Sequence, residues 1–132
     1  MATTTATITI NSSDLTGDAL SLSTTTTLYK ANQTVGLENT SGIGRTKVSS
    51  TTPTDIYTAS EYTAAASNKI YLANKSTDAT EHFIIKVDAE EIGRLYAGDW
   101  MFFPWGAATD ADISYTASVA TGMVLEHMII SE

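Results

Sequence analysis

Apolar and polar residues alternate with a period of two along most of the chain, and this pattern predicts β-strands. In residues 6–10 threonine alternates with isoleucine, and in 18–29 Leu20 and Leu22 share a face opposite small hydroxyl side chains. The alternation is stronger in the C-terminal two thirds. The predicted strands are residues 6–10, 18–29, 69–74, 82–87, 90–96, 99–105, 112–118 and 122–130.

Short strands separated by turns at intervals of about eight to twelve residues predict an all-β antiparallel sandwich, with a jelly-roll-like arrangement as one form of it. Residues 59–68 are the one stretch with helical character, and we expect a short helical turn or a loop there. The chain of 132 residues is expected to form a single domain. Residues 1–17 are interpreted as an extended polar N-terminal arm or first strand, and 54–132 as the core.

Two of the turns have a recognisable basis in their residues. Gly98 occupies the position at which a type II turn requires a positive φ, so residues 96–99 are predicted to place Leu95 and Trp100 on adjacent antiparallel strands. Residues 88–90 are a poorer turn, because Ala89 adopts a left-handed conformation less readily than glycine. We nevertheless expect a hairpin there.

The strand at residues 100–105 is apolar on both of its faces, whereas an antiparallel strand with one wet face alternates. The second face must therefore be covered by loops of the same chain, by the N-terminal segment, or by another chain. Pro104 favours an edge position, where its missing N–H costs nothing. One face carries Trp100, Phe102 and Pro104, and the other carries Met101, Phe103 and Trp105.

Composition narrows the possible functions. The formal net charge of −8 disfavours binding to nucleic acid and to anionic membrane surfaces. The absence of cysteine excludes disulfides and thiolate chemistry. The N-terminus lacks the features of a secretory signal and no apolar run reaches membrane-spanning length, so we expect synthesis in the cytoplasm without secretion.

Candidate chemistry is sparse. His82 and His127 fall on different predicted strands without a metal-ligand spacing, and no nucleophile elbow is present, so we expect no catalytic residues, cofactor or metal. His127 is interpreted as one hydrogen-bonded histidine of a central strand, with a site role as the alternative. Asp110 and Asp112 leave open a cation site or a solvated turn.

We expect apolar surface at the N-terminal strand and around residues 100–105 to contact other chains. Arg94 is included because basic residues are scarce in this chain. Its guanidinium can stack on an aromatic ring or pair with an acid across an interface. The alternative is an ordinary arginine on the surface of a strand. The predicted subunit or capsid interface consists of Ile8, Ile10, Arg94, Trp100, Met101, Phe102, Phe103 and Trp105.

The order of several segments resembles that of small virion structural proteins of tailed bacteriophages. The segments are IGRTKVSSTTPTDIYTA (43–59), KIYLANKS (69–76), FIIKVDAEEIGRLYAGDWMFFPW (83–105) and GMVLEHMII (122–130). The likeness covers roughly residues 43 to 130 and consists of short motifs. It implies a β-sandwich capsid decoration or cement protein, commonly a homo-oligomer and frequently a trimer, and it supplies no catalytic residues.

We therefore expect a non-enzymatic structural protein on the capsid surface that contacts itself and the major capsid protein. Residues 1–10 are expected to lie on the capsid protein, while surface around residues 100–105 holds subunits together. The alternative is a receptor- or glycan-binding module of a tail or head fibre, in which tyrosines such as Tyr57, Tyr62 and Tyr96 stack on sugar rings.

Overall fold

The computed structural model describes residues 3–15 and 17–132 and divides the chain into two compact units, Met1–Glu38 and Asn39–Glu132. The boundary at Glu38 differs from the positions near 17 and 54 at which the sequence suggested a change. Within the described residues the secondary structure is β-strand apart from one short 3-10 turn, Ala59–Glu61. No helix in this part of the chain is long and apolar enough to cross a membrane.

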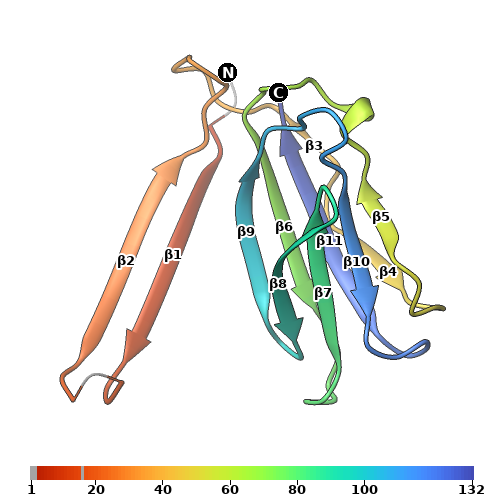
Figure 1. Cartoon of the computed structure of the whole chain (residues 1–132). Coiled ribbons are helices and arrows are strands. Elements are labelled where there is room, and N and C mark those ends of the chain that lie inside the picture. The colour runs from red at the N-terminus through yellow and green to blue at the C-terminus, as the bar shows by residue number, and fades with distance from the viewer. Residues whose placement is uncertain (1–2, 16) are drawn as a thin grey trace. The chain divides into compact units, whose positions relative to one another are not determined.

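The first unit is built on a two-stranded antiparallel ribbon of β1 (Thr5–Ser12) and β2 (Leu20–Thr27) (Figure 1). The register pairs Ile10 with Leu22 and Thr7 with Thr25. The polar N-terminal segment is thus the first strand of a ribbon. Both predicted strands of this region are present with shifted ends.

The second unit is a sandwich of two antiparallel sheets (Figure 1), which confirms the predicted fold class. One sheet has the order β5-β10-β7-β8, and the other has the order β3-β11-β6-β9 with β4 also pairing β11. The strands are β3 (Asn39–Thr40), β4 (Gly44–Lys47), β5 (Thr54–Tyr57), β6 (Asn68–Asn74), β7 (His82–Val87), β8 (Glu90–Tyr96), β9 (Trp100–Trp105), β10 (Ile113–Ala117) and β11 (Val124–Ser131).

The eight strands from β4 to β11 have the connectivity of a jelly roll. The sequence order passes from one sheet to the other at every connection except the β7–β8 hairpin, and the sheets run β4-β11-β6-β9 and β5-β10-β7-β8. This is the eight-stranded double-sheet arrangement of two interlocked Greek keys. β3 extends the β4-β11-β6-β9 sheet, where it pairs with the C-terminal end of β11.

The core lies between the two sheets and is supplied by alternate residues of their strands. Ile70 and Leu72 of β6 and Leu125 of β11 are fully buried from one side, and Phe83 and Ile85 of β7 from the other. The ring centroids of Phe83 and Tyr115 lie 5.6 Å apart in an edge-to-face arrangement, which favours a fixed packing. The predicted alternation within β6 and β7 is therefore confirmed.

The turn between β8 and β9 has the predicted local geometry but a different role. Gly98 has φ +85°, and the Asp99 N–H donates to the Tyr96 carbonyl at 2.9 Å. The pairing of Leu95 beside Trp100 is wrong, because β8 and β9 belong to different sheets and β9 pairs with β6. The turn is a crossover between the two layers.

Buried Asn74 at the end of β6 holds this crossover in place. Its backbone accepts from the Gly98 N–H at 3.1 Å and donates to the Asp99 carbonyl at 2.9 Å. Its side-chain amide donates to the carbonyls of Leu95 at 3.0 Å and Glu81 at 3.3 Å. Asn74 also begins an N-x-S/T glycosylation sequence, but its buried and bonded amide serves the fold.

The predicted β7–β8 hairpin forms through a two-residue turn. Asp88 and Ala89 both have positive φ, of 50° and 63°, and lie between the paired residues Val87 and Glu90. Hairpins of this kind require a left-handed conformation at both central positions, which alanine adopts at a cost. The Asp88 N–H donates to the Asp112 carbonyl at 3.2 Å, so a neighbouring loop supports the turn.

Gly44 of β4 leaves room for the ring of His127 on β11. A Cβ at position 44 would lie 2.7 Å from the His127 Cε1 and 3.3 Å from each ring nitrogen. We predict that Gly44→Ala lowers the free energy of unfolding by about 1 to 3 kcal/mol, because the ring must move and its hydrogen bonds stretch. Urea unfolding followed by tryptophan fluorescence measures the change.

Gly93→Ala is the matched control. A Cβ at position 93 meets no atom within 4 Å and the residue does not have a positive φ. Its effect should stay within about 1 kcal/mol and can be stabilising, since alanine restricts the unfolded chain. Equal losses in the two variants would contradict the close approach at Gly44.

Candidate interaction surfaces

The apolar strand β9 divides its large side chains between the interior and the outside. Trp105 is 4% exposed, and Met101 and Phe103 pack against the core. The indole N–H of Trp105 donates to the Ala111 carbonyl at 2.9 Å. Trp100, by contrast, is 54% exposed. The chain therefore covers one of the two apolar faces of β9 with its own opposite sheet.

The other face of β9 continues across the sheet. Phe102 lies opposite Tyr71 of β6, which lies opposite Met128 of β11, so three half-buried side chains form one row. Pro104, at the sheet edge as predicted, begins the next row. We call this outward surface the Trp100 face; it consists of Arg45, Lys47, Lys69, Tyr71, Ala73, Trp100, Phe102, Pro104, Val124, Glu126, Met128 and Ile130.

A satisfied carboxylate lies within the Trp100 face. Glu126 is only 7% exposed and accepts from Arg45 Nε at 2.8 Å and from the Tyr71 hydroxyl at 3.0 Å. The Arg45 hydrogen bond holds the pKa of Glu126 below its ordinary value, with Tyr71 and the nearby charge of Lys75 acting in the same direction. This part of the face therefore contains no unpaired acid.

Basic residues are concentrated on this sheet. Arg45, Lys47 and Lys69 belong to the Trp100 face, and Lys75 directly follows β6. The Trp100 face thus holds three of the chain's seven basic residues and one of its fifteen acidic residues, Glu126. The acidic Asp99 and Glu132 flank β9 and β11, as Lys75 flanks β6. The face itself therefore carries more basic than acidic residues on a strongly acidic protein.

The ribbon of the first unit also has an apolar side. Strand alternation and the register place Ile8 and Ile10 of β1 on one side with Leu20 and Leu22 of β2. Ile8 is 37%, Ile10 48% and Leu22 46% exposed. We call these four residues the ribbon's apolar face. Its strands contain no charged residue.

The opposite side of the ribbon is a ladder of hydroxyl groups. The hydroxyls of Thr7 and Thr25 are 2.7 Å apart, and those of Thr9 and Ser23 are 3.3 Å apart. Such cross-strand pairs stabilise a ribbon by tenths of a kcal/mol to about 1 kcal/mol each. The ladder helps to fix the register, which keeps the four apolar side chains together on the other side.

The structure places the predicted interface residues in four different environments. Ile8 and Ile10 lie exposed on the ribbon, and Trp100 and Phe102 lie on the Trp100 face. Met101, Phe103 and Trp105 point into the sandwich core. Their apolar area is already used within the chain.

Arg94 lies on the other sheet, in β8, where its Nε donates to Glu91 at 2.9 Å. It thus pairs with an acid three residues away on the same strand.

His127 is hydrogen-bonded on both sides, as predicted for a histidine of a central strand. Its Nδ1 lies 3.2 Å from the Tyr57 hydroxyl, and its Nε2 lies 3.0 Å from the Thr46 hydroxyl. Burial lowers its pKa, because removal from water disfavours the charged form. The ring joins β11 to β4 and β5.

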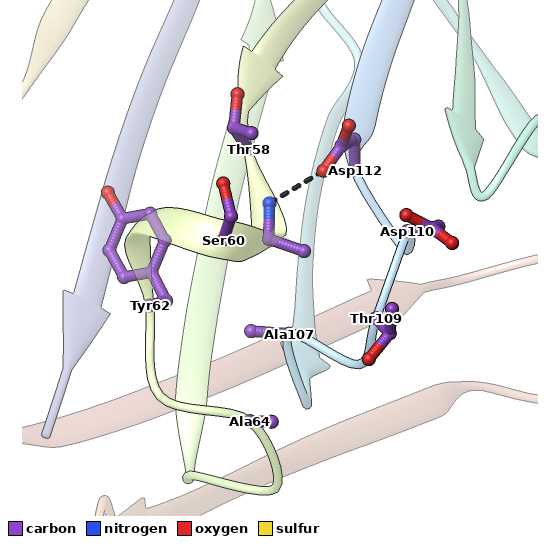
Figure 2. A pocket seen from close by; sticks show the side chains of 9 residues that line it. Thr58, Ser60, Tyr62, Ala64, Ala107, Thr109, Asp110 and Asp112 are labelled. Carbon is purple, nitrogen blue, oxygen red and sulfur yellow. Dashed lines mark hydrogen bonds between the residues drawn. The ribbon is translucent and has the colours of Figure 1, made fainter.

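Asp110 and Asp112 line a cavity of about 270 Å³ between residues 58–64 and 107–112 (Figure 2). Asp112 Oδ1 accepts from the Ala59 N–H at 2.6 Å, so this carboxylate anchors the short helical turn. Within the described residues no three histidine or acidic side chains come together as a metal would require. Asp112 therefore serves the loop geometry through its bond to Ala59.

Comparison of the chain with known protein families, with curated proteins and with solved structures finds no match. The resemblance to tailed-phage virion proteins therefore stays a prediction.

Sequence reasoning did not identify Arg45, Glu126 and Tyr71 as one cluster. These residues are far apart in the chain and come together only through the pairing of β4, β11 and β6. An available signal was Glu126 itself, a single acid in the apolar segment at 123–130.

Replacing each tryptophan by alanine should affect stability differently, because Trp105 lies on the buried face of β9 and Trp100 on the exposed face. We predict that Trp105→Ala lowers the free energy of unfolding by about 3 to 5 kcal/mol, since it empties a core position and removes the bond to Ala111. Trp100→Ala should cost less than about 1 kcal/mol in the dispersed protein. Urea unfolding followed by circular dichroism measures both, and comparable losses would contradict the division.

Stability should depend on pH through His127. Its pKa in the folded chain lies below the ordinary 6.5, so the unfolded chain binds the proton more readily. The free energy of unfolding is therefore highest above about pH 6.5 and falls as the pH drops through the interval between the unfolded and folded pKa values. Urea unfolding at several pH values between 8 and 5 measures the decline.

His127→Gln should flatten this part of the profile, whereas His82→Gln should retain it because His127 is intact. Glu126 acts at lower pH. Because its pKa in the folded chain is lowered, the free energy of unfolding also falls as the pH drops below 4.5, the ordinary pKa of a glutamate. An unchanged slope in His127→Gln would assign the decline to other groups.

Proposed function

We propose that this protein is a non-enzymatic capsid decoration protein of a tailed bacteriophage, which binds the outer shell as a homo-oligomer, a trimer being the expected state, and contacts the major capsid protein. The observation that carries the proposal is that the chain contains two units. One is a sandwich with its own hydrophobic core, and the other includes a ribbon whose apolar face is exposed. A rigid body with a docking segment suits adhesion to repeated sites.

The ribbon needs a partner for energetic reasons. An isolated two-stranded hairpin is at best marginally stable in water, because few apolar contacts offset the ordering of its backbone. Burying Ile8, Ile10 and Leu22 against another surface supplies the missing contribution, on the order of 1 to 2 kcal/mol per side chain. Assembly is thus the condition in which this segment is best ordered.

Repetition strengthens such binding. When several copies are joined, the attachment of one raises the effective concentration of the others at the shell, so individually weak contacts combine into a firm one. A small decoration protein can in this way hold neighbouring capsid subunits together. The virion surface is the proposed location.

The chemistry of the described side chains is compatible with this structural role. Both ring nitrogens of His127 are engaged with hydroxyl groups, and Asp112 is bonded to a backbone N–H. These two residues are thus occupied in maintaining the fold.

The alternative is a receptor- or glycan-binding module, and one observation favours it. Tyr96, 45% exposed, and Trp100, 54% exposed, lie at the two ends of the same turn. Exposed aromatic rings stack on sugar rings, and jelly rolls occur among lectin domains as well as viral capsid proteins.

Purified particles test the proposal directly. Cryo-electron microscopy with an antibody fragment or fused tag on this protein should show it at high copy over the shell. Particles lacking it should lose their contents at a lower temperature than complete particles. Confinement to a fibre or tail would instead support the glycan-binding alternative, and absence from the virion would refute both.

A further inference from the structure

The ribbon's apolar face and the Trp100 face match each other in size. β1 and β2 have eight residues each, and β6, β9 and β11 have seven, six and eight. At about 3.3 Å per residue the ribbon is about 26 Å long, and with its side chains it is about 10 Å wide. Both surfaces are strand arrays with apolar side chains along them.

Their charges are also complementary. The strands of the ribbon are uncharged, whereas its turn carries exposed Asp14 and Asp18 around Leu15, which is 72% exposed. The Trp100 face has apolar rows beside exposed Arg45 and Lys47, and Lys75 follows at the end of β6. An uncharged ribbon can cover the rows while its acidic turn approaches the basic residues.

The one acid within the Trp100 face does not oppose this contact. Glu126 is already bonded to Arg45 and Tyr71, so covering the face leaves no carboxylate without a partner. Two Trp100 faces placed against each other would instead bring like charges together. Charge therefore favours a contact between different surfaces of two copies.

We propose that the ribbon's apolar face of one copy lies on the Trp100 face of a second copy, and that copies exchange ribbons in a closed set. This rests on the proposed homo-oligomer and names how it is held together. One ribbon covers about 260 Å², so two copies exchanging ribbons bury on the order of 1,000 Å², the lower limit for a specific interface. The hydroxyl ladder then faces outward, available to the shell.

A matched pair of variants in the ribbon tests the contact. Ile10→Asp places a charge on the ribbon's apolar face, and Thr9→Asp places the same charge one residue away on the hydroxyl side. Native mass spectrometry and light scattering should show an oligomer for the wild-type chain and for Thr9→Asp. Ile10→Asp should raise the dissociation constant at least tenfold and shift the population toward the 14.0 kDa monomer.

The receiving surface is tested with Trp100→Asp, a change on the exposed side of a folded sandwich. Alone it should dissociate the oligomer as Ile10→Asp does. Mixed in equal amounts, the two variants can form one intact contact, with the ribbon of Trp100→Asp on the Trp100 face of Ile10→Asp. The heterodimer should therefore form more readily than either variant dimerises alone, and less readily than the wild-type chain. Thermal unfolding of each variant verifies that the sandwich is intact.

A wild-type chain that is monomeric at every attainable concentration overturns the proposal, and this outcome includes a ribbon folded onto its own sandwich. An oligomer that survives both Ile10→Asp and Trp100→Asp, or a mixture that dimerises no more readily than either variant alone, also overturns it. These results are separate from the location on the particle: a monomer found at high copy on the shell would reject ribbon exchange and keep the decoration function.

Discussion

The crossover at Gly98, held by buried Asn74, is the constraint on which the arrangement of the protein depends. Because the chain leaves β8 in one sheet and enters β9 in the other, Leu95 and Trp105 both contribute to the space between the layers. Asn74 links the two strands at this point by bonding to the backbone of Leu95, Gly98 and Asp99. The position of the turn sets the phase of β9, and so decides that Trp105 points inward and Trp100 outward.

That phase gives the sandwich an apolar surface on its outer side. A strand that is apolar on both sides must leave one side uncovered when only one opposing sheet is present. The uncovered side here joins aromatic and aliphatic side chains of β6 and β11 to a basic border, on a protein that is otherwise strongly acidic. The ribbon has the converse composition, with an uncharged apolar side and an acidic turn. The strand register places the apolar side chains of each surface together on one side.

Polar interactions in the sandwich mainly fix geometry. His127 connects three strands through Tyr57 and Thr46 and requires the absence of a side chain at Gly44. Asp112 ties one loop to the short helical turn at residue 59, and the carbonyl of the same residue supports the turn at Asp88. That second contact explains how a hairpin with poor turn residues forms: the surrounding loops compensate the local cost of a left-handed alanine.

The sequence by itself determined eight of the eleven described strands, because side-chain alternation in segments such as 69–74 and 82–87 reflects a requirement that each strand bury one side. It did not predict β3, β4 and β5, which are two to four residues long and too short for a clear alternation. It also determined the turn at Gly98 and the edge position of Pro104. The first follows from the freedom of glycine to adopt a positive φ, and the second from the missing N–H of proline. Only the tertiary structure decided which strands pair, and thus that Leu95 and Trp100 belong to different sheets and that Arg45 meets Glu126. Pairing depends on contacts between residues far apart in the chain, and a local pattern carries no information about which distant strand will supply them.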